Sequence, residues 1–426
     1  MNERQLAFKI LNKIERDNAY SNLTLDAALR ENAAASASSS AFVTALVYGV
    51  TERKITLDFI LSRYLTKPLK KLRPEVLTVL RLGAFQLCFM NKVPVSAAVN
   101  ESVKLVKGCG CAYASGLVNS VLRKVAKDGF TYEKTGDTTR DFCIMYSCPE
   151  ALINKFIDDY GKEVTEKILS SSLGARPVTA RVNTLKASPD ELIALLSGEN
   201  AIAEKCPEDE NYIILKNTGA VEELKAYKAG FFHVQDISCG KAVKALSPKA
   251  GDTVFDMCSS PGGKAFTAAQ LMKNKGKILA FDLYPQRVKL CEEGALRLGI
   301  DIIEAKVGDA CVFLPEYEKA ADKVLCDVPC SGFGIIGRKP EIRYKDIAII
   351  DNLLPVQYNI LANAAKYVKS GGTLVYSTCT LSRAENEGVC EKFLGNNAEF
   401  RKISFNTIIP TENGGDGFFF AVFGRI

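Results

Sequence analysis

The feature that most constrains this fold is a series of apolar runs that begins after Gly251. Five runs, TVFDMC, KILAFD, IIEAKVGD, KVLCDVP and TLVYSTC, are separated by segments with helical patterning, and FRKISF and GFFFAVFGRI close the chain. Continuous apolar strands that alternate with helices are typical of a parallel sheet covered on both faces. The sequence therefore predicts a doubly wound, mostly parallel α/β domain of the Rossmann type over residues 237–426, with ligands at the carboxyl ends of the strands.

Residues upstream of this domain follow other patterns. From Arg4 to Lys127 apolar residues recur at spacings of three and four, as Leu6, Ile10 and Ile14 do, so we expect an all-α domain over residues 1–135. Residues 141–236 mix a helical stretch with short β-rich runs, which predicts a small α+β subdomain. Because 426 residues exceed what one core usually organises, three domains are a reasonable expectation.

Charge is distributed unevenly between these parts. Residues 1–140 carry 21 Lys and Arg against 12 Asp and Glu, a net charge of +9, whereas residues 141–426 carry 34 against 37, a net charge of −3. Such asymmetry is typical of a nucleic-acid-binding part joined to a different kind of domain, although a solvated helical surface would look the same. No apolar run approaches the roughly 18 residues of a membrane span, and no export signal is recognisable, so we expect no membrane partner.

Fourteen cysteines lie mostly inside apolar segments. The chain contains no CxxC pair and a single histidine, His233, which we expect to be a strand residue, so no metal site is predicted. Without an export signal the cysteines are expected to be reduced thiols of a cytoplasmic protein, most of them small buried hydrophobic residues.

A glycine-rich loop follows the first of the apolar runs. Gly262 and Gly263 would let backbone approach a ligand closely, and the following helix would offer free N–H donors. Asp282 ends the next strand about 20 residues later, where an acidic side chain commonly accepts ribose hydroxyls. Asp309, after the third strand, would reach the same crevice. The alternative for Asp282 is an ordinary turn or capping aspartate.

Two cysteines stand at the ends of the fourth and fifth strands. The fourth strand delivers Asp327 and Cys330, and the fifth delivers Cys379. A buried structural cysteine is the usual fate of this residue, but two thiols with Asp327 and Lys264 form a set of acid, nucleophile and base. A thiol redox pair of Cys326 and Cys330 is a weaker reading, because it leaves the glycine loop unexplained.

Several segments together resemble a known family. FDMCSSPGGK, DVPCSGFG, RKPEIRY, LVYSTCT and NGGDGFFF resemble, in order and spacing, the RNA cytosine C5-methyltransferases of the Sun family, also called Nop2/Sun or RsmB type. SNLTLDAAL, FVTALVYGVTERKITLDFIL and VNSVLRKV resemble the NusB-like all-α RNA-binding domain. The resemblance implies a class I methyltransferase domain behind a NusB-like bundle, acting as a monomer on RNA. The domain order implies small-subunit rRNA, 16S, at a cytosine-967-type site.

The same resemblance implies S-adenosylmethionine as cofactor, without a metal. Its site would consist of the loop residues with three aspartates: Cys258, Ser259, Ser260, Pro261, Gly262, Gly263, Lys264, Asp282, Asp309 and Asp327. The position of Cys379 is that of the nucleophile, and that of Cys330 belongs to product release. Replacement of Cys-Ala-Ala by Cys-Ser-Ser before PGGK is a small-for-small change.

The chemistry of cytosine agrees with these roles. C5 is a poor nucleophile until a thiolate adds at C6, so Cys379 needs a positive surrounding, for which Lys264 is our candidate. Asp327 would hold cytosine N3 and offer it a proton, which calls for a carboxyl pKa raised by burial. The base must be unstacked, and we expect Arg338, Lys339 and Arg343, with Tyr344, to hold the RNA backbone around it.

Some alternatives remain open at this stage. Tyr376 and Phe333 are candidates either for packing against a base or for filling the core. The chain would also fit a non-catalytic RNA-binding or ribosome assembly factor with a vestigial methyltransferase fold. The same chemistry on another rRNA site or on tRNA would require much the same residues.

Overall fold

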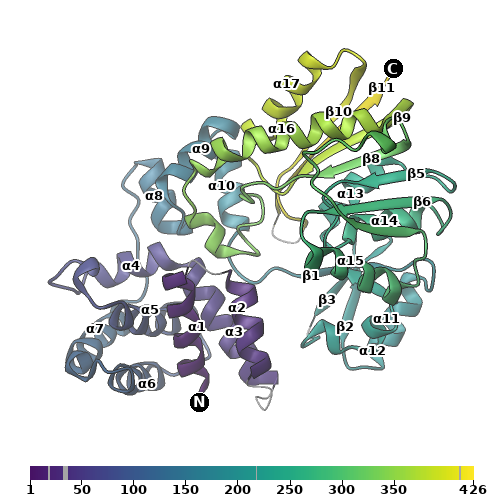
Figure 1. The fold of residues 1–426 in the computed structure, drawn as a ribbon. Coiled ribbons are helices and arrows are strands. Elements are labelled where there is room, and N and C mark those ends of the chain that lie inside the picture. Colours follow the sequence, from purple (N-terminus) through teal and green to yellow (C-terminus); the bar gives the residue numbers. More distant parts are fainter. Residues whose placement is uncertain (18–19, 32–36, 217, 412–413) are drawn as a thin grey trace. The chain divides into compact units, whose positions relative to one another are not determined.

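The computed structural model describes residues 1–17, 20–31, 37–216, 218–411 and 414–426 (Figure 1). The chain forms two compact units. The helical unit comprises Met1–Gly174 and Ile336–Lys345, and the sheet unit comprises Ala175–Ile335 and Asp346–Ile426. The ten residues 336–345 thus belong by their contacts to the helical unit, although strands of the sheet unit precede and follow them in sequence.

The helical unit contains no strand among its described residues, in agreement with the expected all-α part. Its elements are α1 (Glu3–Asp17), α2 (Ser21–Glu31), α3 (Ala37–Glu52), α4 (Lys54–Ser62), η1 (Leu69–Lys71), α5 (Pro74–Phe89), α6 (Val95–Gly108), η2 (Ala112–Ala114), α7 (Ser115–Asp128), α8 (Thr138–Tyr146), α9 (Glu150–Tyr160), α10 (Lys162–Ser171) and η5 (Pro340–Tyr344). In α1, Leu6, Ile10 and Ile14 fall on one face and are buried, as their spacing predicts. The one helical stretch expected within residues 141–236 includes two separate helices, α9 and α10, because Gly161 adopts a positive φ of 78° between them.

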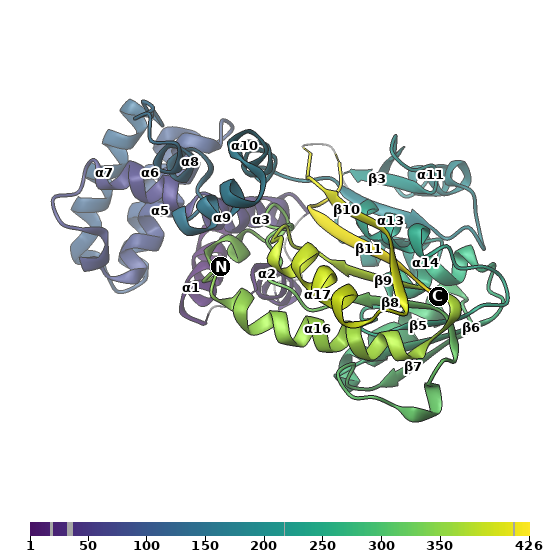
Figure 2. The same cartoon turned by 90° about the horizontal axis from the view of Figure 1, so that it is seen from above.

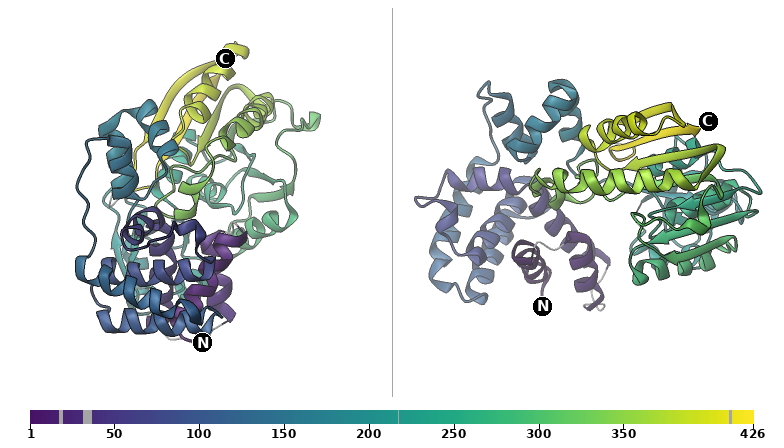
Figure 3. Two further views of the ribbon diagram at one scale, coloured as in Figure 1. Left: turned by 90° about the vertical axis from the view of Figure 1, so that its left-hand side faces the viewer. Right: turned by 45° about the horizontal axis from the view of Figure 1, so that its top comes forward.

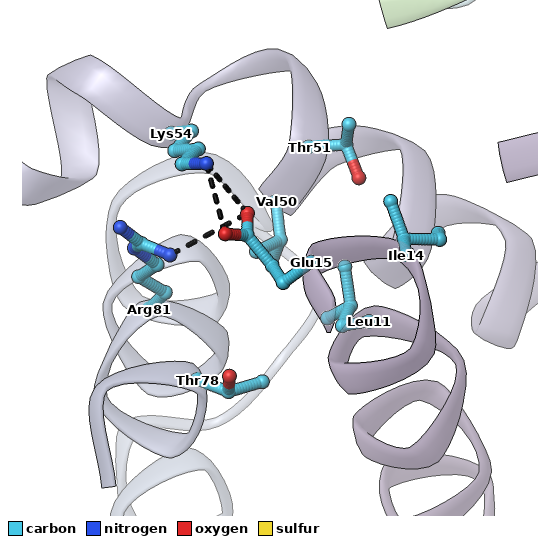
Figure 4. A pocket seen from close by; sticks show the side chains of 8 residues that line it. All are labelled: Leu11, Ile14, Glu15, Val50, Thr51, Lys54, Thr78 and Arg81. Carbon is cyan, nitrogen blue, oxygen red and sulfur yellow. Dashed lines mark hydrogen bonds and ion pairs between the residues drawn. The ribbon is translucent and has the colours of Figure 1, made fainter. Parts of the chain in front are cut away.

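Charged side chains line a small pocket in this helical bundle (Figure 4). Glu15 on α1 lies 2.7 Å from Lys54 on α4 and 3.7 Å from Arg81 on α5. Arg81 also makes a two-pronged ion pair with Asp58, at 2.7 and 2.8 Å. The guanidinium of Arg81 is buried and pairs with both Glu15 and Asp58. These ion pairs join α1, α4 and α5.

The sheet unit begins with a small four-stranded antiparallel sheet. Its strands are β1 (Val178–Val182), β2 (Ile202–Lys205), β3 (Tyr212–Lys216) and β4 (Phe232–Val234), in the order β2-β3-β1-β4. It is accompanied by α11 (Pro189–Ser197), η3 (Val221–Glu223) and α12 (Lys225–Lys228). The small α+β part is confirmed. The sequence did not reveal β2, an edge strand that is largely exposed and so lacks an apolar run.

The second sheet has seven strands in the order β10-β11-β9-β8-β5-β6-β7. The strands are β5 (Thr253–Asp256), β6 (Lys277–Asp282), β7 (Ile303–Val307), β8 (Ala321–Asp327), β9 (Val368–Thr378), β10 (Phe400–Ile408) and β11 (Phe418–Arg425). β5 to β9 pair in parallel, and only β10 and β11 run antiparallel. The predicted doubly wound, mostly parallel sheet is confirmed.

Helices cover both faces of this sheet (Figures 2 and 3). They are α13 (Ile237–Leu246), α14 (Gly263–Leu271), α15 (Pro285–Leu298), α16 (Ile349–Tyr367) and α17 (Val389–Asn396), with the turns η4 (Pro315–Tyr317) and η6 (Ala384–Gly388). One core joins α13, α14 and α15 to the sheet, and another joins α16 and α17 to its other face. Burial on both faces explains why the strands read as continuous apolar runs. None of the described helices is long and apolar enough to span a membrane.

Candidate active site at the carboxyl edge of the sheet

The loop from β5 into α14 is shaped by glycine. Gly262 has a φ of 105°, and a Cβ atom there would lie 2.3 Å from the Phe266 ring. Only glycine fits such a conformation and such a close approach. Gly263 is the first residue of α14, whose free N–H groups favour a ligand with acceptor atoms.

Asp282 and Asp309 lie at the ends of the next two strands, as predicted. Asp282 ends β6, accepts a hydrogen bond from the backbone N–H of Tyr284 at 3.2 Å, and lies 3.4 Å from the Arg287 guanidinium. Asp309 follows β7 and accepts a hydrogen bond from the N–H of Cys311 at 2.8 Å. Both aspartates therefore accept a hydrogen bond from the backbone two residues further on, as ordinary turn aspartates do. Their contact with a ligand stays a prediction.

Lys264 and Asp327 form an ion pair at the same edge. Lys264 Nζ lies 2.6 Å from one Asp327 oxygen, and Ser377 Oγ donates to the other at 2.7 Å. Burial by itself would lower the pKa of Lys264, but Asp327 and neighbouring acidic groups raise it overall, so Lys264 stays charged. Asp327 has a cationic partner and a side chain that is 30% exposed, not the apolar surroundings that the sequence led us to expect. The structure contradicts that part of the prediction.

The two strand-end cysteines face each other. Cys330 Sγ and Cys379 Sγ are 3.3 Å apart, and both residues are partly buried. The backbone holds their loops together, because Gly334 N–H donates to the carbonyl of Cys379 at 3.0 Å and Val328 N–H donates to that of Ser377 at 3.1 Å. The hydrogen bond with Cys379, burial and the nearby carboxylates raise the pKa of the Cys330 thiol well above its usual value.

Two further polar residues of this edge were missed by sequence reasoning. Ser377 orients Asp327, as described above. Asp256, the last residue of β5, is 1% exposed, and neither of its oxygens makes a hydrogen bond of standard geometry with a described residue. Burial raises the pKa of Asp256 to about 7, against the lowering effect of Lys264. An acidic residue at the carboxyl end of a central strand was the available signal.

These residues fit S-adenosylmethionine. The donor carries a sulfonium and an ammonium cation, a carboxylate and ribose hydroxyls, and so requires both acidic groups and N–H donors. Asp256 is a buried carboxyl without a hydrogen bond of standard geometry to a described residue, and it ends the strand that leads into the glycine turn and the start of α14, so that acidic groups and N–H donors are both present. Among the residues that the structure describes, no cluster of three or more His, Cys, Asp or Glu is arranged to hold a metal ion.

The predicted RNA-contacting residues belong to the helical unit. Arg343 is fully buried, and its guanidinium donates to the carbonyls of Tyr146 at 3.0 Å, Ser172 at 3.1 Å and Ile336 at 3.1 Å. A guanidinium used in this way cannot bind phosphate in the folded protein, so the prediction for Arg343 is wrong.

The neighbours of Arg343 differ in exposure. The Tyr344 hydroxyl is likewise engaged with Glu52 and Ser147. Arg338 and Lys339 are partly exposed, with the Lys339 ammonium 5.6 Å from the ring centre of Tyr20, and their contact with RNA stays a prediction.

Other open assignments are decided by burial. Tyr376 and Phe333 are fully buried, so they fill the core and do not present a ring to a base. His233 lies in β4 as expected, and burial lowers its pKa to about 3, which keeps it neutral. Cys326 is buried in the core, and burial raises its pKa, which is unlike a reactive redox thiol.

Comparison with known proteins gives three matching family models. The model of the 16S rRNA methyltransferase RsmB/F matches residues 243–424, that of the NusB family matches residues 1–127, and that of a ferredoxin-like domain of RsmF/B-like methyltransferases matches residues 148–222. The compact units of the structure divide at Gly174, inside the third match, so the boundaries 1–135, 141–236 and 237–426 remain predictions.

Relatives cover nearly the whole chain. A probable ribosomal RNA small subunit methyltransferase B from Bacillus subtilis is 38% identical over 93% of this chain and 89% of its own length. A protein of the same description from Synechocystis is 35% identical over 98% of both chains.

Solved structures share the fold. The crystal structure of PH0851 has a TM-score of 0.84 and 25% identity over 100% of this chain and 99% of its own. That of NSun6 from Pyrococcus horikoshii with SFG has a TM-score of 0.59 and 24% identity over 65% of this chain and 98% of its own. With its NusB-like helical part, ferredoxin-like region and Rossmann-like sheet, the chain belongs to the RsmB/F, or Sun-type, family of S-adenosylmethionine-dependent rRNA methyltransferases.

Proposed function

We propose that this protein methylates C5 of a cytosine in small-subunit rRNA, with Cys379 as nucleophile and Cys330 assisting product release. The observation that carries the proposal is the pair of thiols 3.3 Å apart, beside the Lys264–Asp327 ion pair. Transfer to an exocyclic amine would need no thiol, whereas transfer to C5 needs a nucleophile at C6. When bound, S-adenosylmethionine supplies an electrophilic methyl group.

We assign the other roles in the reaction to Cys379, Asp327 and Lys264. Cys379 adds as a thiolate to C6, which makes C5 nucleophilic. Asp327, fixed by Ser377 and Lys264, is the group we assign to hold cytosine N3, and the Lys264 ammonium offsets the charge of Asp327 while negative charge develops on the base.

Cofactor binding is assigned to the loop Cys258–Lys264, namely Cys258, Ser259, Ser260, Pro261, Gly262, Gly263 and Lys264, together with Asp282, Asp309 and Asp327. To this set we add Asp256, because its carboxyl is buried without a hydrogen bond of standard geometry to a described residue. The electrostatic reason is the same for each aspartate: the donor carries cationic groups and hydroxyl donors.

Removing the nucleophile tests the reaction. Cys379→Ala is expected to abolish methyl transfer to rRNA, measured as incorporation of labelled methyl groups, while calorimetry still shows donor binding. Retained transfer in Cys379→Ala would refute the assignment. If calorimetry detects no binding of S-adenosylmethionine to the wild-type protein, the alternative is favoured, which is an RNA-binding or assembly factor without catalysis.

Removing the second thiol tests the release step. With Cys330→Ala the covalent RNA–protein species should accumulate with RNA and donor present, visible as a band of reduced mobility that survives denaturation. If no such band forms, Cys330 has another role.

The target base is a separate part of the proposal. We propose a cytosine of the 967 type in 16S rRNA, and bisulfite sequencing of total RNA from cells with and without the gene tests it. Loss of signal at another rRNA position or in tRNA would move the substrate, but not the chemistry. With rRNA as substrate, we expect the enzyme to act as a monomer in the cytoplasm, which size-exclusion chromatography and fractionation can check.

A further inference from the structure

A buried carboxylate lies behind the pair of thiols and was not part of any motif considered above. Glu385 is 0% exposed and belongs to η6, a π-helical turn that begins five residues after Cys379. Such turns are rare and occur often at functional sites. A buried carboxylate is costly unless its oxygens are hydrogen-bonded, so its partners show what it does.

The Glu385 carboxylate has one partner on the loop that carries Cys330 and another on α16 that also contacts this loop. Ser331 donates twice, through its N–H at 2.8 Å and through its hydroxyl at 2.6 Å. The Gln357 amide donates at 3.0 Å to Glu385 and also at 3.0 Å to the carbonyl of Pro329. Residues on both sides of Cys330 are therefore tied to this one carboxylate.

The loop after Cys379 is held by the same turn. The Thr380 hydroxyl lies 2.8 Å from that of Ser331 and 3.4 Å from Glu385, and Asn386 donates to the carbonyl of Thr380 at 3.0 Å. Because Ser331, Gln357 and Thr380 are all fully buried, these bonds are not exchanged with water. The turn thus makes hydrogen bonds to a residue next to each of the two cysteines.

We propose that Glu385 is a positioning residue of the methyl transfer: it fixes the Cys330 loop so that the Cys330 thiol keeps its proton and donates a hydrogen bond to the Cys379 sulfur. This inference rests on the proposed function. Ser331 is the direct link between the carboxylate and Cys330, and the negative charge of Glu385 opposes a second negative charge on that side of the pair. The raised pKa of Cys330, to which Glu385 contributes, agrees with this order of protonation.

The hydrogen bond matters most when the product leaves. As the C5 proton passes to a base in solvent, its C–H electrons form the C5=C6 double bond, the Cys379–C6 bond breaks, and its electron pair stays on the Cys379 sulfur. The Cys330 S–H then stabilises the departing thiolate. Solvent water accepts the proton, no oxidant is needed, and the enzyme returns to its starting state.

The test follows the lifetime of the covalent RNA–protein species. Glu385→Gln preserves size but removes the charge, and we expect release to slow about tenfold or more, as loss of a hydrogen bond to a charged group would produce. Adduct formation and donor binding should stay near wild-type values. In addition, Cys330 should be alkylated faster by iodoacetamide at a given pH, measured by mass spectrometry of its peptide. Glu391→Gln, an exposed glutamate of α17, is the matched control.

A second variant guards against misfolding of the first. Ser331→Ala keeps the carboxylate and the backbone bond but removes the hydroxyl link, so its release should be slowed by an intermediate amount. The positioning role would be overturned if both variants released the covalent adduct at the wild-type rate. It would also be overturned if both variants lost donor binding to the same extent as adduct release. If Cys330→Ala traps the adduct and Glu385→Gln does not, this inference fails and the proposed function stands. If no wild-type adduct forms and Cys379→Ala stays active, the proposed function itself fails.

Discussion

At the scale of single residues, the site contains acidic groups whose surroundings differ sharply. Asp327 is partly exposed and paired with Lys264, whereas Asp256, on a neighbouring strand, is buried without a hydrogen bond of standard geometry to a described residue. Desolvation therefore raises the pKa of Asp256. From the sequence we expected the buried carboxyl to be Asp327, but the buried carboxyl is Asp256.

Asp256 should make stability depend on pH. Its pKa of about 7 in the folded protein lies above the usual value, so between about pH 4 and 7 the folded state holds a proton that the unfolded state has lost. Stability should therefore fall as pH rises through this window, by up to about 1.4 kcal/mol per pH unit, and level off above pH 7. Asp256→Asn should remove this slope, measured as the thermal midpoint of the donor-free protein at pH 5, 6, 7 and 8. Equal slopes for both proteins would contradict it.

The two loop glycines should respond differently to a methyl group. Gly262→Ala combines a positive φ with a 2.3 Å contact to the Phe266 ring, so we expect a loss of about 1–3 kcal/mol in stability and weaker donor binding by calorimetry. Gly263→Ala is the control, since its Cβ would meet only the Gln235 amide at 3.4 Å. Similar losses at both positions would show that loop geometry is not the cause.

At the scale of elements, the two antiparallel strands at the end of the chain complete the sheet beside the strand that carries Cys379. β11 pairs with β9 along Phe419–Gly424, and the ring of Phe423 lies 5.2 Å from Phe393 and 6.0 Å from Phe405. This cluster joins β11, α17 and β10. The position of β9, and with it that of Cys379, depends on this packing.

Removing one of these rings should be costly. Phe423 is 0% exposed, so Phe423→Ala should destabilise the sheet unit by about 3–5 kcal/mol, seen as an earlier transition in urea. Ile403→Ala, in the adjacent strand but 56% exposed, should change stability by less than about 0.5 kcal/mol. A small effect of Phe423→Ala would mean that the packing of β10 and β11 contributes little to the stability of the sheet unit.

At the scale of the whole molecule, residues 336–345 are a short segment of the helical unit that lies, in sequence, between two parts of the sheet unit. They follow the Cys330 loop in sequence, but their contacts lie in the helical unit. Glu341 accepts hydrogen bonds from the N–H and hydroxyl of Ser21 at 3.2 and 2.6 Å, and the buried Arg343 donates to carbonyls at the ends of α8 and α10. Residues 336–345 therefore contribute buried contacts to the helical unit, although the chain before and after them belongs to the sheet unit.

Substitutions at Arg343 and Lys339 should affect different properties. Arg343→Met should lower the stability of the helical unit, and Lys339→Ala should weaken RNA binding. Arg343→Met leaves several buried carbonyls without donors, so we expect the helical unit to lose about 3 kcal/mol or more, followed as an earlier thermal transition. Lys339→Ala should leave the transition in place and weaken binding of rRNA fragments by a few fold, more at low salt, because it removes one positive charge. An unchanged transition in Arg343→Met would argue against the anchoring role.

Much of the fold could be predicted from the sequence because it depends on local sequence patterns. Apolar runs and helical spacing depend only on neighbours in sequence, so the seven strands of the large sheet and the helical first part were predicted. β2 was missed because an exposed edge strand has no apolar run, and the break at Gly161 was missed because it requires the backbone angle. Its charge and its position just after the Cys330 segment suggested RNA contact for Arg343, whose burial no local pattern reveals.

The amino-acid order is enough to predict which chemical groups stand at the strand ends: the glycine loop, the aspartates and the two cysteines, since the carboxyl ends of parallel strands meet at one edge of the sheet. How those groups are paired follows from the folded structure. Asp327 is paired with Lys264, Asp256 has no hydrogen bond of standard geometry to a described residue, the two sulfurs are 3.3 Å apart, and Glu385 binds the residue after Cys330. Pairing depends on distances and burial between residues far apart in the chain, which sequence order does not contain.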